Sequence, residues 1–127
     1  MIDRVTSLRE IRKVLIRPEI FKVMSDELSV DDYTPDPTNI CYRVGKGLMV
    51  YEVQGDTVEM HGALIKGDIK EGFISQIHEQ WQDLKQQGFK GVFTKHPKNH
   101  IRASMMVRAA GMDKLDNDDF NLYYKVL

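Results

Sequence analysis

The sequence has very few cysteines and no long apolar run. Cys41 is alone among 127 residues, so no disulfide can form within the chain, and a disulfide-stapled scaffold is excluded. No apolar stretch is long enough to span a membrane, and the first four residues, Met1-Ile2-Asp3-Arg4, do not resemble a secretory signal. A lone cysteine without these segments suits a reducing compartment, and we expect a cytoplasmic protein without a membrane partner.

The sequence also lacks an excess of positive charge. It has 18 basic and 19 acidic side chains, for a net charge of −1. A non-specific nucleic-acid binder would be more basic, so we expect no nucleic-acid partner. With 42% hydrophobic and 29% charged residues the composition is that of an ordinary globular chain. The length predicts a single domain over residues 1–127.

Hydrophobic spacing and turn residues predict two helices and four strands in the first half of the chain. Ser7 and Glu10 have the spacing of a capping box at a helix start, and Pro18 ends that helix near Ile16. Pro18 also suits the first position of a second, short helix. The expected elements are an edge strand at Ile2–Val5, a helix with Leu8, Ile11, Val14 and Leu15 on one face, a short helix burying Ile20, Phe21 and Met24, an acidic loop at Ser29–Thr38, and strands at Ile40–Val44, Leu48–Val53 and Val58–Ile65.

The second half of the chain alternates between helical and strand patterns. The expected elements are a helix at Glu71–Gln87 closed by Gly88, a strand at Phe89–Thr94, a helix at Asn99–Ala110 closed by Gly111, and two closing strands, the second over Phe120–Val126. A helical crossover between Val58–Ile65 and Phe89–Thr94 would make these strands parallel neighbours. A crevice then opens at their carboxyl ends, where a helix amino terminus also points and where ligands bind in such sheets.

The long helix carries an apolar stripe with helical spacing. The residues expected to face the core are Phe73, Ile74, Ile77, Trp81 and Leu84, and those expected to face solvent are Glu79, Gln80, Asp83 and Gln86. Together the elements predict an α/β fold with a central mixed, mostly antiparallel sheet of six to seven strands and about four helices on both faces.

This element order resembles that of the GNAT family of N-acetyltransferases. The ending Asn99-His100-Ile101 to Ala110-Gly111-Met112 is similar to the family's last helix, which a polar residue opens and a Gly-aromatic pair closes. Ile16–Glu27 and Glu59-Met60-His61 resemble small GNAT-like proteins of tailed phages that serve in head assembly or inside the virion. The resemblance implies either transfer of an acyl group from acyl-CoA to an amine or a role among phage structural proteins, in the host cytoplasm or the virion.

The family's phosphate loop would fall on Gly67–Gly72, where only Gly72 matches the family's glycine pattern. By the resemblance, residues that would contact acetyl-CoA are Leu64, Ile65, Lys66, Lys70, Gly72 and Asn99. Asp68 and Glu71 instead have the spacing of an acidic capping box, which would occupy the helix amides and repel phosphate. Lys66 and Lys70 argue the other way, because lysines pair with phosphate. Both interpretations stay open, and any acetyl-CoA binding is expected to be weak.

Two catalytic positions follow from the same resemblance. The family's tyrosine that protonates the leaving thiolate would lie at Val107, which cannot do so. Glu59 and His61 lie two residues apart on one face of the central strand, and a base on this strand takes the amine proton in such enzymes. Histidine titrates close to neutral pH, which suits that task. The alternative is that both side chains face a solvated side of the sheet.

No metal site is expected from the sequence. His96 and His100 are four residues apart, but Pro97 separates them and no third ligand is evident. Two functions therefore stay open. One is an acyl-CoA-dependent N-acyltransferase acting on a small-molecule or protein amine. The other is a non-catalytic phage virion or head-assembly protein, which the missing tyrosine and the degenerate loop favour.

Overall fold

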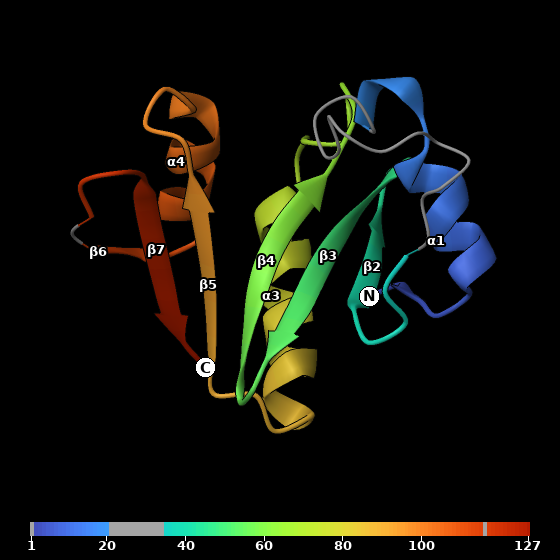
Figure 1. Cartoon of the computed structure of the whole chain (residues 1–127), viewed down its shortest axis with the longest axis horizontal. Coiled ribbons are helices and arrows are strands. Elements are labelled where there is room, and N and C mark those ends of the chain that lie inside the picture. Colours follow the sequence, from blue (N-terminus) through green and yellow to red (C-terminus); the bar gives the residue numbers. More distant parts are fainter. Residues whose placement is uncertain (1, 21–34, 116) are drawn as a thin grey trace.

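The fold is a mixed seven-stranded sheet with helices packed on both faces. The computed structural model describes residues 2–20, 35–115 and 117–127. The strands lie in the order β1-β2-β3-β4-β5-β7-β6, and only β4 and β5 pair in parallel (Figure 1). The elements are β1 (Arg4–Val5), α1 (Leu8–Leu15), β2 (Ile40–Val44), β3 (Gly47–Gln54), β4 (Thr57–Ala63), α3 (Phe73–Gln86), β5 (Gly91–His96), α4 (Ile101–Ala109), β6 (Asp113–Leu115) and β7 (Asn121–Val126). The predicted fold class is confirmed, and element bounds differ from the expected ones by a few residues.

Each face of the sheet has its own hydrophobic core. One core joins α3 and α4 to the sheet through Tyr42, Tyr51, Val58, Met60, Phe73, Trp81 and Val107, among others. The second lies under α1 and contains Val5, Ile11, Leu15, Cys41, Leu48 and Val50. Within the described residues, no helix is long and apolar enough to cross a bilayer.

The amino-terminal helix begins where the sequence predicts. The Glu10 amide donates a hydrogen bond to Ser7 Oγ at 3.3 Å, which is the backbone half of the expected capping box. Residues 18–20 are again helical, and Ile20 is buried as expected. Phe21, Met24 and most of the Ser29–Thr38 loop lie outside the described residues.

The long helix α3 buries the predicted apolar stripe, but two polar residues differ from expectation. Gln80 is 2% exposed and accepts a hydrogen bond from the Tyr51 hydroxyl at 2.7 Å. Asp83 is half-buried and accepts one from the Tyr42 hydroxyl at 2.6 Å. The prediction that both face solvent was therefore wrong. Strand tyrosines reach up to the helix and supply the donors that allow polar side chains at the helix–sheet interface.

Strands β4 and β5 pair over a short stretch and then separate. The parallel register joins Thr57 to Gly91, Val58 to Val92 and Glu59 to Phe93, although both strands continue further. Figure 1 shows the two arrows diverging toward their carboxyl ends. The predicted parallel pair is thus confirmed, and it opens at the end where a crevice was expected.

Burial along the last strand, β7, does not alternate from residue to residue, and Tyr123 is its one buried residue. Tyr123 is 1% exposed, whereas Val126 is 71% exposed. Tyr123 pairs with Thr94 of β5, which places both on the sheet face covered by α3 and α4.

Candidate active site

A cleft of about 320 Å³ lies where β4 and β5 separate. Its walls come from β3, β4, β5, α3 and α4, and they are mostly apolar. The main apolar residues are Met49, Met60, Leu64, Phe73, Ile77, Met106 and Val107, and the polar ones are Thr94, His96, His100 and Arg102. A concave, largely apolar site with a few polar groups is typical of small-molecule binding.

The edge of β4 is open along this cleft. The Met60 carbonyl points toward β5, because it accepts a hydrogen bond from Thr94 Oγ1 at 2.9 Å. Backbone groups alternate sides along a strand, so those of Gly62 point the same way. Gly62 lies beyond the last residue of β4 that pairs with β5. Its backbone is therefore placed to pair with an amide of a ligand in the cleft.

The amino terminus of α3 has no side-chain cap. Gly72 is the N-cap residue with φ of +88°, and no side chain there accepts a hydrogen bond from the helix amides. Of the two interpretations left open by the sequence, the capping box of Asp68 and Glu71 is therefore ruled out. The Phe73 amide donates a hydrogen bond to the Lys70 carbonyl at 3.0 Å. The first turn of α3 contains no acidic residue, so its other amides and the helix dipole are available to an anion.

Asp68 instead fixes the loop that precedes α3. Its carboxylate accepts hydrogen bonds from the Lys46 amide at 3.0 Å and the Ile65 amide at 2.9 Å, and the residue is 5% exposed. It packs against Gly45 and Gly47, where a Cβ atom would collide with its oxygens. The negative charge is thus buried against the β2–β3 turn and does not cap the helix.

The six residues expected at acetyl-CoA lie in different environments. Leu64 lines the cleft, and Gly72 caps α3. Ile65 is half-buried, and Lys66 and Lys70 are exposed in the loop between β4 and α3. Asn99 lies exposed in the turn before α4. It does not open that helix as expected, because the N-cap residue is His100.

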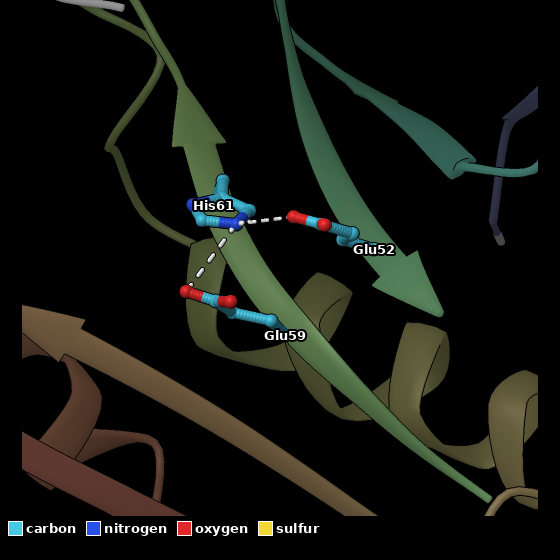
Figure 2. Close-up of side chains that lie close together, drawn as sticks. All are labelled: Glu52, Glu59 and His61. Atoms are coloured by element: carbon cyan, nitrogen blue, oxygen red, sulfur yellow. Dashed lines mark ion pairs between the residues drawn. The ribbon is translucent and has the colours of Figure 1, made fainter. Parts of the chain in front are cut away.

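The two predicted base residues converge on β4, and a third residue joins them. Figure 2 shows Glu52, Glu59 and His61 pointing toward one another from β3 and β4. His61 Nε2 lies 3.5 Å from Glu52 Oε2 and 3.5 Å from Glu59 Oε2. Sequence reasoning missed Glu52, although the signal was present. The two-residue turn at Gly55-Asp56 sets the hairpin register that places Glu52 directly opposite Glu59.

Glu59 and His61 do not line the cleft itself. The cleft is lined by Met60, Gly62 and Leu64, and side chains alternate between the two faces of a strand. Glu59 and His61 therefore project from the other face of the sheet. Glu59 is 8% exposed, whereas His61 is exposed and lies past the last paired residue, beside the gap between β4 and β5.

The comparisons with known proteins give one kind of match. Neither a family model nor a curated protein sequence matches this chain significantly. Solved structures match over its whole length. A GNAT-family acetyltransferase from Staphylococcus aureus has a TM-score of 0.69 at 14% identity, with 100% of this chain and 99% of that one covered. The PaiA N-acetyltransferase of Thermoplasma acidophilum, solved with coenzyme A, has a TM-score of 0.68 at 10% identity, with 100% and 99% covered.

An acetyltransferase of Bacillus subtilis, also solved with CoA, has a TM-score of 0.63 at 14% identity, with 100% and 99% covered. This chain has the GNAT fold. At these identities the likeness shows the fold alone. The proteins above are acetyltransferases, and what they bind is a property of those proteins.

The position expected to protonate the leaving thiolate holds Val107, which has no proton to give. Val107 is buried and lines the cleft. His96 is a polar residue of the same cleft wall; it is half-buried, and its Nε2 lies 3.5 Å from Thr94 Oγ1. Burial lowers the pKa of His96, and the nearby His100 and His61 lower it further.

Among the described residues, neither the His96–His100 pair nor Cys41 forms a metal or nucleophile site. His96 and His100 both line the cleft, but in the described residues no third ligand-type side chain converges with them. Cys41 is 1% exposed under α1, and burial raises the pKa of its thiol to about 11. It is therefore a protonated core residue at neutral pH.

Proposed function

We propose that this protein is an acyl-CoA-dependent N-acyltransferase that acts on an amine. The observation that carries the proposal is the separation of β4 and β5, which opens a cleft of about 320 Å³ at their carboxyl ends. In mixed and parallel sheets this is where ligands bind. The uncapped amino terminus of α3 adds an anion site next to the β4–α3 loop.

The residues present fit coenzyme A in three places. The amides at the start of α3 suit its pyrophosphate. The exposed Lys66 and Lys70 lie in the loop just before this helix, where they can pair with phosphate. The free edge of β4 at Gly62 suits its amide groups. The apolar cleft wall suits its acyl end. The negative charge of the exposed Glu71 repels an anion at this place. Only Gly72 matches the glycine pattern of the family's phosphate loop. We therefore expect weak acetyl-CoA binding, with a binding free energy of about −5 kcal/mol.

When bound, acyl-CoA supplies an activated acyl thioester for transfer to a nitrogen. The chain must then remove a proton from the acceptor, because an ammonium has no lone pair to attack with. His61 Nε2 is the proposed proton acceptor, and it stands beside the gap between the strands. Glu59 Oε2, at 3.5 Å, stabilises the imidazolium that forms. Val107 cannot protonate the leaving thiolate, so we expect slow turnover.

Binding of acetyl-CoA is the first test, by isothermal titration calorimetry on the full chain. A dissociation constant in the hundreds of micromolar is expected, which corresponds to about −5 kcal/mol. A Cβ atom at Gly62 would make only ordinary contacts with Leu64 and Met49, so we expect Gly62→Val to fold, to place its methyl groups in the cleft and to lose binding. Ala109→Val introduces a valine at an exposed position of α4 and should bind like the wild type. Unchanged binding by Gly62→Val, or no binding by the wild type, would refute the assignment of the cleft.

Acyl transfer to a panel of primary amines is the second test. His61→Ala should lower turnover by roughly two to four powers of ten, the usual contribution of a positioned base. Glu59→Gln should cost less, because it acts through the imidazole. Acetyl-CoA binding without transfer to any amine would retain the cofactor site and reject the catalytic assignment.

The non-catalytic phage role is the second function predicted from the sequence. It rests on the resemblance of Ile16–Glu27 and Glu59–His61, and the three neighbours above are described as acetyltransferases. The absence of an acid at Val107 and the degenerate phosphate loop at Gly67–Gly72 favour it. A chain that neither binds acetyl-CoA nor transfers acyl groups, and that copurifies with phage particles, would support this role instead.

A further inference from the structure

We propose that Glu52, Glu59 and His61 form a binding site for a divalent transition-metal ion, with Zn²⁺ as the ion to test. The three side chains offer one nitrogen and two carboxylate oxygens that all lie within 4.8 Å of one another (Figure 2). They come from two adjacent strands, β3 and β4, that are joined by a tight hairpin. This proposal does not rest on acyl transfer, and it departs from the sequence analysis, which expected no metal.

The distances within this Glu52–Glu59–His61 cluster suit a shared ion better than direct hydrogen bonds. His61 Nε2 is 3.5 Å from an oxygen of each glutamate. Nitrogen–oxygen hydrogen bonds are about 2.7–3.2 Å long, so neither contact is one. Two donors bound tetrahedrally to one Zn²⁺ at about 2.0–2.1 Å are roughly 3.4 Å apart. The imidazole nitrogen is thus already at the required distance from both carboxylates.

Glu59 supplies an independent reason for a cation. Its side chain is only 10% exposed, and in the described part of the chain no donor outside this cluster reaches its carboxylate. Burying a carboxylate without a hydrogen-bond donor is costly, and such groups are normally paired with a cation or coordinate a metal. Figure 2 shows the carboxylates of Glu59 and Glu52 approaching the same His61 nitrogen from two sides.

The register of the hairpin places two negative charges side by side, and a bound ion would remove their repulsion. Glu52 and Glu59 are directly opposed partners on neighbouring antiparallel strands. Like charges in that position repel each other and destabilise the sheet. A divalent ion between them turns this repulsion into two attractive contacts.

The donor set defines the class of ion. Imidazole and carboxylate ligands suit Zn²⁺ and neighbouring first-row ions, whereas Mg²⁺ and Ca²⁺ prefer oxygen ligands alone. Three protein ligands leave a fourth tetrahedral position for water or a ligand. Glu52 and His61 are 47% and 43% exposed at their side chains, so an ion can enter from solvent. A bound ion would also occupy the lone pair of His61 that the proposed reaction uses.

Calorimetry with ZnCl₂ on the chelator-stripped full chain is the test. We expect saturable binding of one ion per chain, and little heat from MgCl₂ at the same concentration. Glu52→Gln and His61→Asn should each weaken binding at least about tenfold, because loss of a supporting residue around a metal site alone costs that much. His100→Gln and Glu71→Gln change an exposed histidine and an exposed acid elsewhere and should leave the affinity unchanged.

Imidazole nitrogen resonances provide a readout that does not depend on affinity. On adding Zn²⁺, the His61 Nε2 signal should shift, and the signals of His78, His96 and His100 should stay in place. Circular dichroism before metal addition checks that each variant folds. Equal Zn²⁺ affinity of wild type and both ligand variants, or shifts at the other histidines in place of His61, would overturn the proposal.

Discussion

Thr94 Oγ1 donates a hydrogen bond to the Met60 carbonyl at 2.9 Å, one step beyond the last paired residues of β4 and β5. Backbone pairing between these strands ends at Glu59 and Phe93. The next carbonyl on β4 therefore loses its backbone donor, and the threonine hydroxyl replaces it. Thr94 is 3% exposed and lines the cleft. The side chain thus closes the narrow end of the gap that forms the candidate site.

Removing the Thr94 hydroxyl should destabilise the protein. Thr94→Val leaves the Met60 carbonyl buried without its donor, which typically costs about 1–3 kcal/mol. Thr94→Ser keeps the hydroxyl and should retain the hydrogen bond, with a smaller loss from the missing methyl group. Urea unfolding of the three proteins measures both effects. Equal stability of the valine and serine variants would show that the hydrogen bond contributes nothing.

Asp68 should support the β4–α3 loop, which reverses an expectation from the sequence. If Asp68 capped α3, the change Asp68→Asn would remove a negative charge that repels a bound phosphate. In the structure its carboxylate accepts from the amides of Lys46 and Ile65. Asp68→Asn turns one acceptor into a donor, and hydrogen bonds to a charged group contribute about 1.5–3 kcal/mol. We expect a loss of stability of that order, seen in urea unfolding, and weaker acetyl-CoA binding.

Glu71→Gln is the matched control for the Asp68 variant. Glu71 is exposed just before α3, where its charge opposes an anion but supports no described contact. Its stability should stay within about 0.5 kcal/mol of the wild type, as for most surface changes. Its acetyl-CoA affinity should rise modestly. Tighter binding by Asp68→Asn at unchanged stability would contradict the loop assignment.

Trp81→Ala should be among the most destabilising single changes. Trp81 is 4% exposed in the core between α3 and the sheet, and replacing a large buried aromatic with alanine costs about 3–5 kcal/mol. The adjacent Gln82→Ala, at an exposed position of the same helix, should change stability by less than about 0.5 kcal/mol. Denaturant midpoints compare the two variants. A small effect at Trp81 would contradict its place in the core.

The fold was predictable because its signals are local. The helix stripe that contains Trp81, the capping serine at Ser7 and the turn at Gly55 each depend on residues close in sequence. Gln80 was misassigned because its partner, the Tyr51 hydroxyl, comes from a strand 29 residues away. Hydrophobic periodicity counts a glutamine as polar and carries no information about such a distant donor.

The candidate site was predictable only in part, for the same reason. Glu59 and His61 are two residues apart on one strand, so their proximity follows from strand geometry. The placement of Asp68 does not, because its carboxylate is held by the β2–β3 turn at Lys46, 22 residues earlier. The spacing to Glu71 indicated a cap, and the tertiary contact determined another role.

The pH dependence of stability should contain a contribution from His96. Burial lowers the pKa of His96, with His100 and His61 adding to the effect, and its Nδ1 is buried without a hydrogen-bond partner in the described residues. The pKa of a histidine in the unfolded chain is about 6.5, so the unfolded state binds this proton at higher pH than the folded state does. This contribution to stability is therefore complete above that pH and is lost as the pH falls from about 6.5 through the lowered pKa.

His96→Gln removes this titration and should flatten the fall in the urea midpoint between about pH 7 and pH 5. His100→Gln removes one nearby positive charge and should raise the pKa of His96, followed by its imidazole resonances. His78→Gln is the comparison, because His78 lies on α3 and its Nε2 contacts the Ala110 carbonyl. It should leave the titration of His96 unchanged. An unchanged pH profile in His96→Gln, or a His96 pKa at the ordinary histidine value, would show that His96 is hydrated in the cleft and makes no such contribution.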